Sequence, residues 1–223
     1  MRDTVSGEVM GVVDLSTTWN RHSPLALHAV ERFAQRVSQA LQSLSHAPVL
    51  RLRMLGTPQA FLQGRALALS PRQLEILCLL TLHPEGLDLE RLHAALYGDR
   101  PVGVATLKTE VSQLRDRLGG AIGSRPYRLL VNWQADFRDL EQALDAGRIE
   151  TALACYRGAF LPRTESPLLR VWRDCLESRL SDAIFRVDDP DVLLNHLGQS
   201  PEAVDALQRL GELLPPDHPG RQL

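Results

Sequence analysis

The sequence predicts an α+β protein that is mostly helical. Two observations lead to this prediction. Short segments with alternating apolar residues occupy 49–69, whereas apolar residues from 136 to 214 recur at helical spacing. The segment 104–118 has the pattern of an amphipathic helix, and a short basic hairpin is predicted directly after it, within 121–131. A helix followed by such a hairpin is typical of a winged helix-turn-helix, so we expect that fold followed by an α-helical domain.

The charges divide the chain into three parts, although its overall net charge is only −2. Residues 1–46 carry four basic and four acidic side chains, residues 47–134 carry eleven and seven, and residues 135–223 carry ten and sixteen. The middle part is therefore positive by 4 and the last part negative by 6. We predict three domains with these bounds, of which only the middle one is expected to face phosphate.

The first part predicts a strand at 9–15 and a long amphipathic helix at 24–44. One strand and one helix cannot bury a core by themselves. Their partner could be the rest of this chain, a second copy, or a sensor domain missing upstream. The near-heptad spacing of the helix favours dimerisation, but packing against its own chain is equally compatible with the pattern.

The middle part predicts a small sheet and helices in a fixed order. Ser70 precedes a proline and is followed three residues later by Gln73, which together predict a capping box at a helix start. The expected strands are 49–55, 58–63 and 65–69, the expected helices are 71–83, 89–97 and 104–118, and the wing is 121–131.

The helix 104–118 has two contrasting faces. Its apolar face is predicted to be buried and consists of Val104, Leu107, Val111, Leu114 and Leu118. Uncharged polar residues occupy the centre of the opposite face: Thr106, Thr109 and Gln113. Lys108, Ser112 and Arg115 follow one edge, and Glu110 and Arg117 follow the other. Such a face suits a helix in a DNA major groove, because short polar groups reach base edges while cations meet phosphates.

The last part predicts only helices, at 136–146, 148–160, 167–187, 190–198 and 201–214. Several of these starts place Ser or Asp immediately before a proline, as at Ser166, Asp189 and Ser200. Antiparallel helices joined by short loops indicate a bundle or repeats of the tetratricopeptide kind.

Several classes of protein are not indicated. No apolar run is long enough for a membrane helix, and no signal peptide follows the first residues. The cysteines Cys78, Cys155 and Cys175 and the seven histidines lack metal-ligand spacing, and the cysteines are expected to be buried in a reducing cytoplasm. No phosphate loop, nucleophile elbow or dinucleotide fingerprint is present. We therefore expect a cytoplasmic protein that is not an enzyme and has no catalytic residues, metal or cofactor.

Four motifs of the middle part resemble the winged-helix output domain of OmpR-like response regulators: Ser70–Leu77, Leu92–Asp99, Val111–Leu118 and Tyr127–Leu129. Residues 152–158 and 161–163 resemble the helical domain that follows such winged helices in some actinobacterial regulators. Gly11–Leu15 and the following amphipathic helix resemble the end of a GAF-type sensor domain. This resemblance implies a bacterial sensor-regulator of which the present chain is the C-terminal portion.

The resemblance also implies roles for individual residues. The helix 104–118 would enter the major groove, and the wing would touch the adjacent groove or backbone. Gln113 stands where the family commonly has arginine, and glutamine can pair with adenine. Pro126 replaces the usual glycine before the wing tyrosine. The complete set of expected DNA-binding residues is Thr106, Lys108, Thr109, Ser112, Gln113, Arg115, Arg117, Arg125 and Arg128.

The function expected from these observations is transcription regulation. The protein would bind double-stranded DNA as a homodimer, and its acidic helical part would contact other subunits or the transcription machinery. The alternative is a protein–protein interaction module that works through the helical part, with the winged helix as a scaffold.

Overall fold

The computed structural model describes residues 32–33 and 49–214. The chain divides into two units, Met1–Pro48 and Val49–Leu223, and each is considered by itself. The predicted strand 9–15 and nearly all of the predicted helix 24–44 lie outside the described residues. Only Arg32 and Phe33 of that helix are described; both are helical and exposed.

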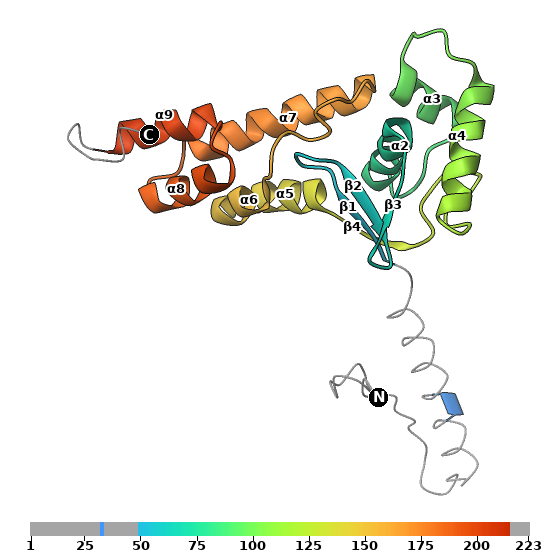
Figure 1. The fold of residues 1–223 in the computed structure, drawn as a ribbon, viewed down its shortest axis with the longest axis horizontal. Helices are drawn as coiled ribbons and strands as arrows, with labels where there is room; N and C mark the ends of the chain where they lie inside the picture. Colours follow the sequence, from blue (N-terminus) through green and yellow to red (C-terminus); the bar gives the residue numbers. More distant parts are fainter. Residues whose placement is uncertain (1–31, 34–48, 215–223) are drawn as a thin grey trace, which may run out of the picture. The chain divides into compact units, whose positions relative to one another are not determined.

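A four-stranded sheet lies at the start of the second unit (Figure 1). Its strands are β1 (Val49–Arg53), β2 (Gln59–Leu62), β3 (Arg65–Leu67) and β4 (Asn132–Ala135), in the order β3-β2-β1-β4. β2 pairs antiparallel with both β1 and β3, whereas β4 pairs parallel with β1. Alternate residues of β1, Leu50 and Leu52, are completely buried, and the arginines between and after them face outward.

The strand β4 was missed by the sequence analysis. It has four residues, and only Ala135 at its end is fully buried, so it carries little of the alternation that marks a strand. Its pairing partner β1 lies far away in the sequence, with Val49 opposite Asn132. A parallel pairing between such distant segments cannot be recognised from local pattern alone.

Three helices complete the winged-helix part: α2 (Pro71–Leu82), α3 (Leu89–Tyr97) and α4 (Val104–Arg117). The capping box is present, because the Ser70 hydroxyl accepts from the Gln73 backbone and the Gln73 side chain accepts from the Ser70 backbone. α2 packs against α3, α4 and α7, so it is buried on several sides. Helical spacing in the sequence predicts an inward face of Leu74, Leu77, Cys78, Thr81 and Leu82. Ile76, Leu79 and Leu80 are completely buried as well, whereas Leu74 and Leu82 are only half-buried.

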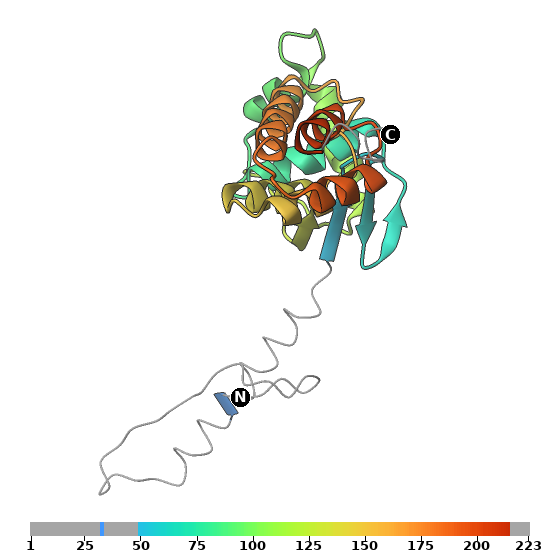
Figure 2. The same ribbon diagram turned by 90° about the vertical axis from the view of Figure 1, so that its left-hand side faces the viewer.

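Helices form the remainder of the unit: α5 (Asp136–Asp145), α6 (Ile149–Cys155), α7 (Pro167–Ile184), α8 (Pro190–Gln199) and α9 (Val204–Leu213). α6 packs against α5, α7 and α8, and α9 packs against α7 and α8; Figure 2 views the unit from the end where α8 and α9 lie. The starts at Ser166 and Asp189 are confirmed, because both side chains accept a hydrogen bond from the first turn that follows.

Three predicted helix bounds were wrong. The helix 167–187 ends at Ile184. The helix 148–160 ends at Cys155, because the following residues pair with the segment after β1: Gly56 donates to the Ala159 carbonyl and Leu161 to the Met54 carbonyl, each at 3.0 Å. The helix 201–214 begins only at Val204, because the Ser200 amide still donates to the His196 carbonyl and ends α8.

The winged-helix part and the helical part share one continuous core within 49–214. An aromatic cluster lies where they meet: Phe137 and Phe160 rings are 4.8 Å apart, and Trp172 lies 5.3 Å and 4.7 Å from them. Phe137 and Phe160 are completely buried. This cluster ties α5 and α7 to the segment that pairs with the sheet.

Candidate nucleic-acid interface

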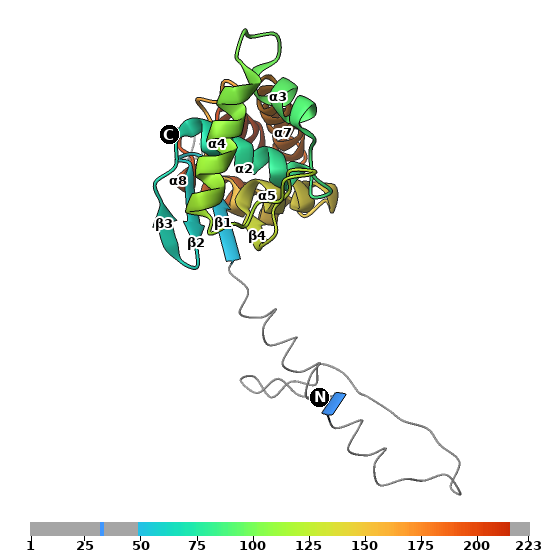
Figure 3. The ribbon, with the colours of Figure 1, turned by 90° about the vertical axis from the view of Figure 1, so that its right-hand side faces the viewer.

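α4 is held by its apolar face, which packs against α2 (Figure 3). Leu107, Val111, Leu114 and the following Leu118 are at most 3% exposed, as predicted. Val104 was predicted to join them but is 43% exposed. Val104 is the first residue of α4, where the helix extends beyond the core. Helical spacing alone therefore predicted its burial wrongly.

The opposite face of α4 is open to solvent. Thr106, Lys108, Thr109, Ser112 and Gln113 are all exposed, so the structure brings these predicted residues together on one surface. The Thr109 hydroxyl donates to the Ala105 carbonyl at 3.0 Å, which fixes its rotamer and leaves its oxygen available as an acceptor. This surface therefore presents short polar groups beside a cation.

Arg115 is not on that open surface. It is half-buried, and its guanidinium donates to the carbonyl of Ile122 at 2.9 Å and to the hydroxyl of Ser124 at 3.1 Å. A longer bond of 3.5 Å reaches the Gly123 carbonyl. The structure thus places Arg115 between α4 and the wing, where it fixes the position of one against the other.

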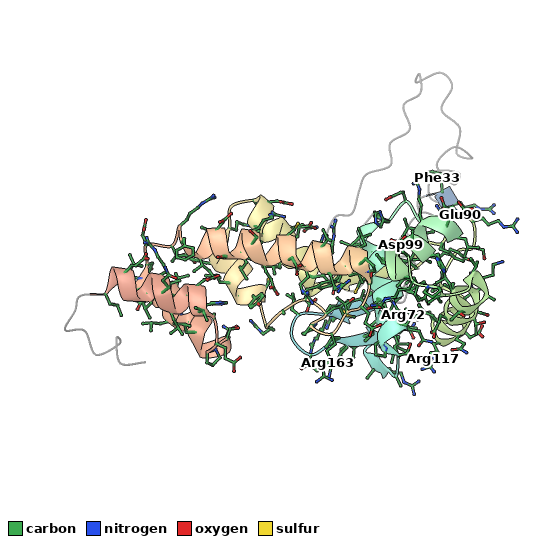
Figure 4. The ribbon with its side chains drawn as sticks, turned by 90° about the horizontal axis from the view of Figure 1, so that it is seen from above. Phe33, Arg72, Glu90, Asp99, Arg117 and Arg163 are labelled. Atoms are coloured by element: carbon green, nitrogen blue, oxygen red, sulfur yellow. The ribbon has the colours of Figure 1, made fainter. Side chains whose placement is uncertain are left out.

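Arg117 also has an intramolecular partner, because its side chain donates to the carbonyl of Ala68, after β3. It remains exposed, and Figure 4 labels it near the end of α4. The acids of the helix differ in exposure: Asp116 is exposed, whereas Glu110 is half-buried with its Oε2 atom covered. Only Asp116 therefore adds an accessible negative charge to this part of α4.

The wing is a short antiparallel loop. Ile122 bridges to Leu129, and the Gly123 amide donates to the Arg128 carbonyl at 2.8 Å. Arg125 and Arg128 are exposed, as expected for side chains that would meet a phosphate backbone. The two sides of the wing form only one β-bridge and no strand, so contacts with the rest of the fold are needed to hold the wing in place.

The tip of the wing is anchored to the turn before α3. Leu87 and Tyr127 exchange two backbone hydrogen bonds, at 2.9 Å and 2.8 Å. Gly86 has φ of +100°, and a Cβ atom there would lie 2.7 Å from Pro126 Cγ. Pro126 therefore packs onto a position where only glycine fits.

A buried carboxylate connects α2 to the segment before α7, and the sequence analysis did not single it out. Glu75 is 4% exposed, and its Oε1 accepts from the Thr164 hydroxyl at 2.6 Å and from the Glu165 amide at 2.8 Å. Its Oε2 is paired with Arg72 at 2.6 Å. Arg72 in turn lies over the ring of Tyr97, 4.6 Å from its centroid. In the sequence, a glutamate that stands among the apolar residues of a predicted helix indicates such a buried carboxylate.

A second carboxylate connects the end of β1 to the start of α5. Asp136, the first residue of α5, accepts from the backbone amides of Met54 at 2.8 Å and Leu55 at 3.1 Å. It also accepts from the Phe137 amide at 2.8 Å. Burial raises the pKa of Asp136, although these hydrogen bonds oppose the rise. Asp136 and Glu75 therefore link the winged-helix part to the helical part by hydrogen bonds.

Other kinds of site have little support in the part of the chain that the structure describes. No group of three or more His, Cys, Asp and Glu within 32–33 and 49–214 could hold a metal ion. Cys78 is buried and Cys155 half-buried, but Cys175 is exposed, contrary to expectation, because it lies on the outer side of α7. None of the described helices is long and apolar enough to cross a membrane.

The arrangement of a small sheet, three helices, a wing and a helical part defines a winged-helix fold followed by a helical domain. The same fold is found in Mycobacterium tuberculosis EmbR, solved in complex with a low-affinity phosphopeptide. The two structures superpose with a TM-score of 0.51 at 20% identity, over 74% of this chain and 54% of that chain. At this identity the likeness concerns the fold.

A sequence relative is the uncharacterized 47.3 kDa protein in the thcA 5′ region of Rhodococcus erythropolis. It is 29% identical over 203 residues, which are 86% of this chain and 46% of that protein. The chain thus spans about half the length of each of these two proteins. No family model matches the sequence.

Proposed function

We propose that the chain is a DNA-binding transcriptional regulator that places α4 in the major groove and the wing 121–131 on the flanking groove or backbone. The observation that carries this proposal is the open polar face of α4 beside a wing that Arg115 holds in place. A helix that presents short polar side chains and is flanked by exposed cations matches the chemistry of base edges and phosphates.

The proposed roles follow from exposure. Thr106, Thr109 and Gln113 would contact base edges, with Gln113 suited to bidentate pairing with adenine. Lys108 and Ser112 would contact phosphates on one side of the groove. The remaining exposed cations that would contact phosphates are Arg117, Arg125 and Arg128. Arg115 is better suited to positioning the wing than to a phosphate contact, because its donors already have acceptors.

The domain organisation belongs to the same proposal. Residues 47–134 would bind DNA, and residues 135–223 would form an acidic surface for other subunits or the transcription machinery. A homodimer would double the number of phosphate contacts and so strengthen binding. The assignment of residues 1–46 to a GAF-like sensor rests on the sequence pattern alone.

The second candidate is a protein–protein interaction module in which the winged helix is a scaffold. The observation in its favour is the exposure of Leu168 and Val171 on α7, at 40% and 61%. These apolar side chains belong to the negatively charged helical part. This candidate predicts a partner that requires residues 136–223 and no salt-sensitive DNA binding.

The experiment is a salt titration of binding to the DNA upstream of the protein's own gene, with the full chain. We expect the logarithm of the association constant to fall linearly with the logarithm of salt concentration, by about 0.9 per phosphate neutralised. Gln113→Ala is expected to weaken binding to the preferred site about tenfold and to leave non-specific binding unchanged. Lys108→Ala is expected to weaken both and to lower the salt slope by about 1.

The matched control is Arg148→Ala, which removes an exposed arginine from the helical part. It is expected to leave both affinity and salt slope unchanged. Absence of binding at low salt, or equal binding by wild type and the α4 variants, would reject DNA binding. A partner captured through 136–223 in that case would favour the second candidate.

A further inference from the structure

A cavity of about 550 Å³ lies between segments of the winged-helix part and the segment that leads into α7. Its walls come from the turn Gly56–Pro58 between β1 and β2, the start of α2 and the segment Leu161–Thr164. Sites for small molecules have volumes of about 300–1,000 Å³. None of the proposed DNA contacts lines this cavity, so it is a separate feature of the fold.

The backbone around the cavity is fixed in conformation. Three of the lining residues are prolines, whose rings lock φ: Pro58, Pro71 and Pro162. Leu161 has φ of +39°, a left-handed conformation that a residue other than glycine adopts only where its surroundings impose it. Its amide donates to the Met54 carbonyl at 3.0 Å, which holds this conformation in place. The cavity is therefore preformed, and a ligand would lose little affinity to the ordering of its walls.

Several side chains of the lining are apolar and still in contact with water. Pro58 and Leu74 are half-buried, whereas Pro71 and Pro162 are exposed. A hydrocarbon group in the cavity would remove part of this surface from water, which favours binding. The lining therefore suits a ligand with an apolar body.

Two lining residues carry hydrogen-bond donors that have no acceptor among residues 49–214. They are the guanidinium of Arg163, which Figure 4 labels, and the hydroxyl of Thr57. Both residues are exposed. The nearby Arg100 differs, because it pairs with Glu165 at 2.7 Å. Arg163 is thus a cation that can bind an external anion without giving up a partner.

The one carboxylate in the lining, Glu75, is already neutralised within the fold. Its Oε1 accepts three hydrogen bonds from the segment 164–166, and its Oε2 pairs with Arg72 at 2.6 Å. The charge of Arg163 therefore remains in excess at the cavity. The positive end of the α2 dipole, at Pro71, acts in the same direction. These charges favour an anion over a cation.

We propose that this cavity binds a small monocarboxylic acid with an apolar body, in its ionised form. The Arg163 guanidinium pairs with the carboxylate, the Thr57 hydroxyl donates to it, and the hydrocarbon body lies along Leu74 and the prolines. A guanidinium can donate two parallel hydrogen bonds to a carboxylate, which makes this pairing strong and directional. The proposal does not rest on DNA binding.

The test is a titration of the full chain with sodium hexanoate, followed by calorimetry and by the backbone NMR signals of Gly56 and Thr164. We expect saturable binding with a dissociation constant on the order of 1 mM, as suits so small a ligand. Both signals should shift, whereas that of Gln113 on α4 should not. Sodium acetate lacks the apolar body and hexan-1-ol lacks the carboxylate, so each is expected to bind about tenfold more weakly.

Two variants at exposed positions test the polar contacts without disturbing the core. Arg163→Gln is expected to weaken hexanoate binding about tenfold and to leave hexan-1-ol binding unchanged. Thr57→Glu places a second carboxylate beside that of the ligand and should weaken hexanoate binding in the same selective way. The matched control is Arg148→Gln, which removes an exposed arginine outside the cavity and should leave binding unchanged.

Three results would overturn the proposal. One is the absence of a saturable response to hexanoate in the folded wild type. Another is equal affinity for hexanoate and for either acetate or hexan-1-ol, since both the charge and the apolar body are required. The third is equal hexanoate binding by wild type and Arg163→Gln, which would mean that this cation does not receive the carboxylate.

Discussion

The Nε atom of Arg115 donates a hydrogen bond to the carbonyl of Ile122 at 2.9 Å, so a cation of α4 faces the wing rather than the open side of the helix. The same guanidinium reaches Ser124 at 3.1 Å. One side chain thereby joins α4 to the wing, the two elements of the proposed DNA interface. Arg115 therefore contributes to the proposed interface through the hydrogen bonds that position the wing, in addition to its positive charge.

The first prediction separates the charge of Arg115 from its geometry. Arg115→Lys keeps the positive charge but cannot reach several acceptors in a fixed fork. We expect it to weaken DNA binding about as much as Arg115→Ala, roughly tenfold, and to leave the salt slope nearly unchanged. Binding would be measured by fluorescence anisotropy at several salt concentrations. Arg128→Lys, at an exposed wing position, should bind like wild type; full affinity in Arg115→Lys would show that only the charge matters.

The second prediction concerns the link between α2 and α7. Glu75→Gln removes a charge that pairs with Arg72 and accepts from Thr164, Glu165 and Ser166. Loss of one partner from a buried network leaves the others unsatisfied, so we expect a loss of about 2–4 kcal/mol in the free energy of unfolding. Urea denaturation measures this. Glu90→Gln, on the exposed side of α3, is the control and should change stability by less than about 0.5 kcal/mol.

The third prediction concerns the aromatic cluster. Phe160→Ala leaves a hole between Phe137 and Trp172, whose rings lie 4.8 Å and 4.7 Å from that of Phe160. We expect a loss of about 3–5 kcal/mol in the free energy of unfolding. Phe185→Ala removes the same side chain from a position that is 37% exposed and should cost clearly less. Similar losses for both variants would mean that the cluster is not the joint between the two parts of the fold.

The sequence was sufficient for the elements whose signals are local. The capping side chains of Ser70, Ser166 and Asp189 and the prolines after them mark helix starts, because one side chain and the next few residues determine such a start. The apolar face of α4 from Leu107 to Leu118 follows from helical spacing in the same way. These signals were enough to predict the winged helix and the helical part that follows it.

The parts that were missed depend on contacts between distant segments. Strand β4 exists because Asn132–Ala135 lies beside β1, and α6 ends at Cys155 because Phe160 forms a bridge with Leu55, just after β1. Arg115 looked like a phosphate contact because its charge is visible in the sequence and its acceptors on the wing are not. Helical spacing cannot show which of two neighbours a long side chain will reach.

The fourth prediction is a pH dependence of stability that originates at His196. Burial lowers its folded-state pKa below the unfolded value of about 6.5, so the folded protein binds this proton less readily than the unfolded chain. The stability contributed by the neutral ring is therefore present above that value and is lost as the pH falls through the folded pKa. Its slope cannot exceed about 1.4 kcal/mol per pH unit, the limit for one proton.

The measurement is urea denaturation of wild type and His196→Leu between about pH 7.5 and pH 5. Glu177 acts in the opposite direction, because its raised pKa makes the folded state bind a proton more readily on acidification. The quantity to compare is therefore the difference between the two proteins, in which the Glu177 contribution largely cancels. This difference should shift in favour of His196→Leu as the pH falls below about 6.5. A difference that stays constant with pH would show that the ring is not held neutral by burial.

The fifth prediction tests how the wing is anchored. Gly86 has φ of +100° and supports Pro126, whereas Gly119 has φ of +61° with nothing within 4 Å of the Cβ position. Alanine at either position pays about 1–2 kcal/mol for the left-handed backbone. Gly86→Ala must in addition displace Pro126 and the Leu87–Tyr127 hydrogen bonds. We expect it to destabilise the protein more than Gly119→Ala and to speed hydrogen exchange at the Tyr127 amide. Equal exchange rates in the two variants would mean that the wing does not rest on Gly86.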